Sequence, residues 1–271
     1  MSIQTIAHSQ QHRRILLFLA LTYALSAPWW ALSLVISAPG LPDRLPITDA
    51  GAAFMPALSA ILLTAREGGR RGVAELVGRL GDWRRLRAAW WLVILGSAPV
   101  FFAATYFAMG ALGLRLQHAW GSSTSPALAF LIFFLGAIGE ELGYTGYALQ
   151  GLHGRKTAIV VALILGVGWA IWRLPSMIEL GQSAQLLVWG LAVTVAFRLI
   201  YALIYFSSGH SLFSIVLLHA LLNTGRTMFP GGRRGFEMDN AAVGYGIVIL
   251  TAIFLSTLWT VWRRPDPLPC T

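Results

Sequence analysis

Polar side chains that could do acid–base chemistry interrupt four long apolar stretches of this sequence. They are Glu140 with Glu141, Arg173, Arg198, and His219 with Asn223. An ionisable side chain inside a membrane span is costly, and it marks a functional site by default. We therefore expect these residues to carry whatever chemistry the chain performs.

The two adjacent glutamates cannot face the same neighbour. On a helix, Glu140 and Glu141 point about 100° apart, so that one can face a cavity while the other contacts a second helix. The alternative is that both only pair with arginines and hold the helices together. A stripe of small residues beside them would let another helix approach closely. It consists of Gly136, Gly139, Gly143 and Gly146.

His219 and Asn223 are four residues apart, which puts them on one face of a helix. A base or ligand beside an amide donor could address the same small substrate group. Trp169 and Arg173 share a face for the same reason, and Pro175 is expected to stop or kink their helix. Arg173 could equally reach the membrane interface beside the tryptophans.

The composition predicts that all these residues lie in a membrane protein. Of 271 residues, 56% are hydrophobic and only 11% are charged, and the mean hydropathy is +0.67. Because about 20 apolar residues cross the hydrocarbon core as a helix, the sequence predicts an all-α, polytopic transmembrane bundle of about eight spans. The expected spans are 15–37, 51–65, 89–112, 126–150, 157–174, 184–206, 211–228 and 241–262.

We expect one membrane domain, 1–271, whose connectors near 38–50, 113–125 and 229–240 are short. The longest polar segment, 66–88, is basic and partly amphipathic, which predicts a cytoplasmic surface helix against anionic headgroups. The first span could be a cleaved signal, although its apolar stretch is long for one. The single Cys270 excludes an internal disulfide and a multi-cysteine metal site.

The net charge of +9 is located at the ends of the spans. No basic module with interleaved aromatic residues occurs, so we expect no nucleic-acid partner. Most arginines fall on the side of the N-terminus when eight spans are counted, which predicts both termini in the cytoplasm. The expected location is a bacterial plasma membrane, with the lipid bilayer as the surrounding partner.

Three motifs occur in a fixed order: EELGYTGY from Glu140, then WAIWRLP from Trp169, then HALLN from His219. This order resembles the CAAX-protease and bacteriocin-processing family of intramembrane proteases, often called the Abi family. The resemblance covers about residues 125–225. It implies a hydrolase, an intramembrane endopeptidase that cleaves a membrane-delivered peptide or protein.

The resemblance also implies a role for each motif residue. Carried over by position, Glu140 is the general base and Glu141 is its partner. His219 activates water or binds a metal, and Asn223 donates to the oxyanion. Trp169 matches the aromatic residue that opens the second motif.

This sequence departs from the family at two positions. Thr145 stands where an arginine is common, and Arg173 stands where the second-motif histidine is expected. Zinc is the family-based alternative to a metal-free site, but Glu140 and His219 alone are too few ligands, and arginine cannot be one. We therefore predict no cofactor and no metal.

Arg173 leaves two functions open. Its guanidinium could donate to an oxyanion, which favours the peptidase. It could also pair with Glu140 and disable this base. The chain would then be a catalytically inactive relative that serves as a scaffold, chaperone or immunity-type binding protein. A transporter is a third candidate, but no internal repeat favours it.

Overall fold

The computed structural model describes residues 3–33, 35, 47–114, 125–150, 155–237 and 241–262, and all regular elements among them are helical. Cys270, the end of the first predicted span and most of the predicted connectors 38–50 and 113–125 lie outside these residues. The elements are α1 (Ile3–Ser33), α2 (Ile47–Ala52), α3 (Met55–Gly78), η2 (Arg79–Arg85), α4 (Ala88–Ala111), α5 (Pro126–Glu141), η3 (Leu142–Tyr147), α6 (Arg155–Glu179), α7 (Ala184–Ser207), α8 (Leu212–Met228), α9 (Gly232–Glu237) and α10 (Ala241–Trp262).

Six helical segments of the described chain are long and apolar enough to cross a membrane. They lie in α1, α4, α5 with η3, α6, α7 and α10, and α8 is a shorter apolar helix. The protein is thus a multi-pass helical bundle, as predicted. The predicted span 51–65 is not among the six, because it combines the end of α2 with the start of α3, and the apolar part of α3 ends before Arg66.

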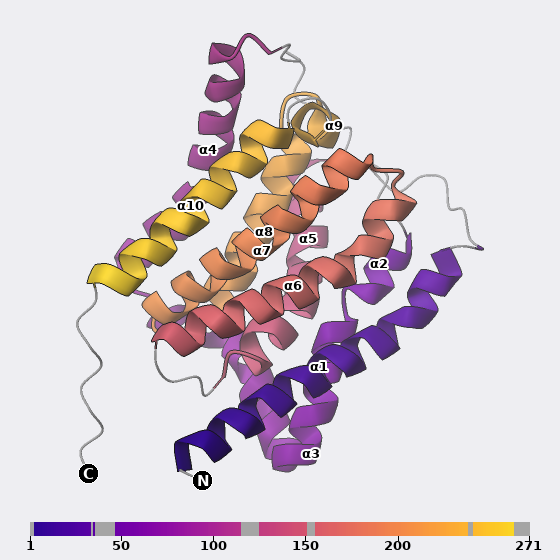
Figure 1. The fold of residues 1–271 in the computed structure, drawn as a ribbon, viewed down its shortest axis with the longest axis vertical. Helices are drawn as coiled ribbons and strands as arrows, with labels where there is room; N and C mark the ends of the chain where they lie inside the picture. Colours follow the sequence, from indigo (N-terminus) through magenta and orange to yellow (C-terminus); the bar gives the residue numbers. More distant parts are fainter. Residues whose placement is uncertain are drawn as a thin grey trace.

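The helices form a layered bundle in which α6 packs against α7, α5 against α8, and α7 against α10. Figure 1 shows α1 and α10 on opposite flanks, with α6 and α7 between them. The start of α1 and the end of α10 lie at the same end of the bundle (Figure 1). Which end faces the cytoplasm stays a prediction.

The glycines beside the glutamate pair allow the turn between α2 and α3 to approach α5, and the start of α3 to approach η3. A Cβ atom on Gly139 would lie 2.4 Å from the carbonyl oxygen of Ala53, and one on Gly143 would lie 2.5 Å from that of Pro56. Gly136 has no such contact with the described residues. Close packing at two of the four glycines therefore brings α2 near the site.

Pro175 does not stop its helix, because α6 continues to Glu179, and the alternative expectation, a kink at Pro175, stays a prediction. A proline inside a helix removes one backbone hydrogen bond and clashes with the carbonyl four residues before it. The next residue, Ser176, donates its hydroxyl to a carboxylate oxygen of Asp49 in α2. This bond connects the last turn of α6 to its neighbour.

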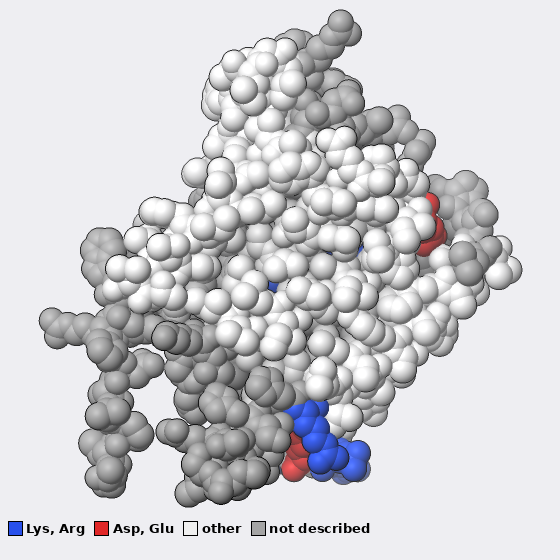
Figure 2. Space-filling model, in the orientation of Figure 1, with Lys and Arg blue, Asp and Glu red and all other residues white. Residues whose placement is uncertain are grey.

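The basic segment 66–88 is helical, as expected, but it is not one straight surface helix. α3 has a break at Gly69, where φ is +61°, and the 3₁₀-helix η2 follows it. Arg70 and Arg71 are exposed. Figure 2 shows most of the visible charged side chains gathered at the end of the molecule where α3 lies, while the broad face has only small blue spots and a red patch at one edge. Contact of this end with lipid headgroups stays a prediction.

Candidate functional site

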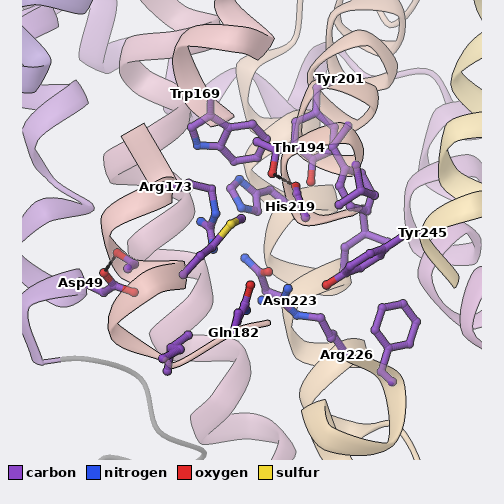
Figure 3. Close-up of a pocket in the computed structure, with 18 of the residues that line it drawn as sticks. Asp49, Trp169, Arg173, Gln182, Thr194, Tyr201, His219, Asn223, Arg226 and Tyr245 are labelled. Carbon is purple, nitrogen blue, oxygen red and sulfur yellow. Dashed lines mark hydrogen bonds between the residues drawn. The ribbon is translucent and has the colours of Figure 1, made fainter. Parts of the chain in front are cut away.

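Arg173, His219 and Asn223 line one cavity of about 70 Å³. Figure 3 shows their side chains together, with Arg173 on α6 and the other two on α8. About 10–15 Å³ of such space holds one water molecule, so this cavity has room for several. Three of the five predicted site residues therefore share one hydratable space.

Glu140 lies behind the wall of this cavity and does not line it. Its side chain is buried, with 6% of the residue exposed. The indole Nε1 of Trp169 donates to Oε2 at 2.6 Å, and a guanidinium nitrogen of Arg173 lies 3.8 Å from Oε1. Both partners line the cavity, so Glu140 is one contact away from it.

Glu141 is fully buried and binds three side chains. Arg198 on α7 donates to both carboxylate oxygens, at 2.7 Å and 3.1 Å. The hydroxyl of Thr145 donates to Oε2 at 2.5 Å, and Nδ1 of His219 lies 2.9 Å from Oε1. With both oxygens occupied, Glu141 is suited to position other residues and not to attack a substrate.

Arg198 is the largest fully buried side chain among the described residues. Its guanidinium carbon lies 4.3 Å from the ring centre of Trp169, 4.9 Å from that of Tyr144 and 5.6 Å from that of Tyr201. Aromatic faces attract a cation through their quadrupoles, and this adds to the ion pair with Glu141. The sequence showed that an arginine at position 198 would be a costly charge inside a span. It did not show that Glu141 is its partner.

His219 is oriented for chemistry by its bond to Glu141. A carboxylate only accepts hydrogen bonds, so Nδ1 carries the proton, and a neutral ring then has its lone pair on Nε2. The ring is held between Trp169 and Tyr201, with both ring centres 5.5 Å away. His219 can therefore accept a hydrogen bond from a water molecule in the cavity.

The helix α8, which carries His219 and Asn223, is fixed at its start by Asp82 of η2. The carboxylate of Asp82 accepts hydrogen bonds from the hydroxyl of Ser211 and from the backbone N–H groups of Leu212 and Phe213. A carboxylate at a helix N-terminus satisfies free N–H groups and interacts favourably with the helix dipole. The basic segment thus helps to position the site.

Asp49 also lines the cavity, and the sequence did not point to it. Burial raises the pKa of Asp49, and its hydrogen bond from Ser176 and the charge of Arg173 oppose this effect. In the sequence, Asp49 is a single acidic residue in a short polar connector, and nothing in that pattern marks it as part of a site. Only the packing of α2 against the bundle brings it to the site.

The described residues do not fit a zinc site. They contain no group of three His, Cys, Asp or Glu side chains that could hold a metal ion. Glu140 has the guanidinium of Arg173 beside it, which cannot be a ligand and repels a cation. The Nδ1 atom of His219 is bound to Glu141, so this histidine could offer only Nε2 as a ligand.

Comparison with known proteins agrees with the three motifs. Residues 122–225 match the family model described as type II CAAX prenyl endopeptidase Rce1-like. The chain is also 21% identical, over 149 residues, to the CAAX prenyl protease 2 of Methanococcus maripaludis, a match that covers 51% of this chain and 53% of that protein. The chain thus spans about half the length of the curated relative that it matches. The matched segment, which holds Glu140, Arg173, His219 and Asn223, is thus similar to the Rce1-like family of CAAX prenyl endopeptidases.

Proposed function

We propose that this protein is an intramembrane endopeptidase that hydrolyses a membrane-associated peptide. The observation that carries the proposal is the cavity shared by Arg173, His219 and Asn223, with Glu140 held one contact behind it. A base, an imidazole acceptor and two types of hydrogen-bond donor are the groups that hydrolysis of a peptide bond requires.

In the proposed reaction, Glu140, which lies one contact behind the cavity wall, takes a proton through one bridging water molecule from the water in the cavity, and the hydroxide attacks the peptide carbonyl carbon. His219 accepts a hydrogen bond from the same water through Nε2 and so orients it. The amide of Asn223 and the guanidinium of Arg173 donate to the oxyanion that forms. When the tetrahedral intermediate collapses, the proton on Glu140 passes to the leaving amine.

The environment of Glu140 suits this role. Trp169 occupies Oε2 with a hydrogen bond of 2.6 Å, and this bond fixes the carboxylate. The contact of Arg173 with Oε1, at 3.8 Å, is longer than a hydrogen bond. Oε1 is therefore the oxygen that remains for water.

An apolar groove next to the cavity supports a lipid-linked substrate. It has a volume of about 740 Å³ and is lined by α4, α7, α8 and α10. Phe101, Phe197 and Leu222 line both the groove and the cavity. The matched relative is named a CAAX prenyl protease, and a prenylated peptide would place its apolar chain in such a groove.

The test of this function is cleavage of a prenylated model peptide by the full chain in liposomes. We expect turnover by the wild type and a loss of about 100-fold in kcat for Asn223→Ala, the cost of removing one oxyanion donor. An unmodified peptide of the same sequence is the control for the apolar groove. Equal turnover by wild type and Asn223→Ala would contradict the proposed role of this amide.

We also expect the purified protein to contain no stoichiometric zinc and to cleave equally with and without a chelator. The reason is that Arg173 replaces a potential third ligand, and two ligands do not make a tight catalytic zinc site. Elemental analysis after mild purification measures the metal content. About one zinc per chain, lost in Glu140→Ala, would show that another residue completes a site.

A catalytically inactive binding protein is the second candidate, and the position of Arg173 beside Glu140 favours it. Such a protein would bind the peptide without cleaving it. If the guanidinium is what disables Glu140, Arg173→His should then gain turnover. The peptidase proposal expects the wild type to be active and Arg173→His to turn over less peptide than the wild type.

A further inference from the structure

Asp49 lies outside the matched segment 122–225 but reaches the candidate site from α2. Two close contacts hold this short helix in place. A Cβ atom on Gly51 would lie 2.3 Å from the indole of Trp29 in α1, and the carbonyl of Ala53 packs against Gly139 in α5. α2 is therefore fixed on both sides, and the position of Asp49 is built into the packing.

Asp49 contacts the face of α6 that carries Arg173. Its Oδ1 accepts a hydrogen bond from the hydroxyl of Ser176, which is three residues after Arg173 and so on the same face of α6. Asp49, Ser176 and Arg173 all line the cavity, and Figure 3 shows Asp49 on the same side as Arg173. The charge of Arg173 acts on Asp49 and lowers its pKa, and such attraction is strong where water is scarce.

The charged groups around Asp49 come from two helices. Arg173 and Glu179 lie on α6, and Glu140 lies on α5. Burial raises the pKa of Asp49, Arg173 lowers it, and the two glutamates raise it. The guanidinium of Arg173 thus interacts with two carboxylates, Glu140 and Asp49, that repel each other.

We propose that Asp49 is a positioning residue that shares the guanidinium of Arg173 with Glu140 and so keeps Glu140 available as a base. Arg173 stays 3.8 Å from Glu140 because Asp49 attracts it in another direction. Without the charge of Asp49, Arg173 would close on Glu140, stabilise its ionised form and make proton abstraction harder. The inference rests on the proposed peptidase function, and it explains how an arginine can stand in this site.

The first arm of the test compares the pH profile of cleavage by wild type, Asp49→Asn and Asp49→Glu in the full chain. Asparagine keeps the acceptor for Ser176 and removes the charge. We expect Asp49→Asn to lower kcat by about 10-fold, the effect of one weakened base, and to move the acid limb to lower pH. Asp49→Glu should restore part of kcat, and Glu75→Gln, an exposed carboxylate paired with Arg71, should match the wild type.

The second arm needs no activity. A double-mutant cycle combines Asp49→Asn with Arg173→Gln and measures thermal unfolding of the protein in detergent. We expect the two changes to be non-additive by about 2–4 °C in Tm, whereas Glu75→Gln with Arg173→Gln should be additive. An additive cycle for Asp49, or an unmoved acid limb in an active Asp49→Asn protein, would overturn the proposal. Coupling in a wild type that cleaves no peptide would support the positioning role and reject the peptidase.

Discussion

Arg198→Ala is expected to destabilise the protein by about 3–5 kcal/mol, because it leaves the carboxylate of Glu141 buried without its cation. Both side chains are fully buried, and their closest atoms are 2.7 Å apart. The rings of Tyr144, Trp169 and Tyr201 surround the guanidinium, and they do not compensate the charge of a carboxylate that has lost its cation. Thermal or denaturant unfolding in detergent, followed by circular dichroism, measures the loss.

Two control variants separate this ion pair from simple loss of an arginine. Arg71→Ala removes an exposed partner of Glu75 and should change stability by no more than about 0.5 kcal/mol. Arg198→Met combined with Glu141→Leu removes both charges and should recover most of the stability. The same double variant should be inactive, because His219 loses the acceptor for its Nδ1 proton. A loss below about 1 kcal/mol in Arg198→Ala would contradict the paired, buried charges.

Glu140→Gln is expected to reduce kcat by about 100- to 10,000-fold, the usual contribution of a general base. Glutamine has nearly the same shape, and its amide oxygen can still accept the hydrogen bond that Trp169 makes to Oε2. The change therefore removes the base while the fold stays intact. Cleavage of the prenylated peptide in liposomes measures kcat, and thermal unfolding checks the fold.

The matched control for this prediction is Glu67→Gln. Glu67 is also a glutamate in a polar network, where it accepts a hydrogen bond from Tyr147 and pairs with Arg14, but it does not line the cavity. The Glu67→Gln variant should have a kcat within a few-fold of the wild-type value. Equal cleavage by wild type and Glu140→Gln would mean that Glu140 is not the base.

Much of this protein follows from local sequence alone. Long apolar runs leave the helix as the only element that satisfies its own backbone in lipid, so the bundle could be predicted without a structure. The spacing of four residues put His219 and Asn223 on one face, and both line the cavity. The glycine stripe predicted a close approach, which occurs at Gly139 and Gly143.

Contacts between distant helices could not be predicted in the same way. Periodicity tells which face of a helix is special, but it does not identify the neighbour that this face meets. Glu141 is 57 residues from Arg198 and 78 from His219 in the sequence, and helix packing alone decided that it binds both. The same packing separated the two glutamates, with Glu141 enclosed and Glu140 near the cavity.

The tertiary structure also decided the surroundings of Arg173, the residue on which the function depends. The sequence allowed this side chain to reach the interface, to pair with Glu140 or to donate into a site. Its guanidinium lies 3.8 Å from Glu140 and shares a cavity with Asp49, which is brought there by a helix that ordinary sequence patterns do not mark. An ion pair forms only where two charges from separate helices meet in a low-dielectric interior, and that meeting is set by the packing of the whole bundle.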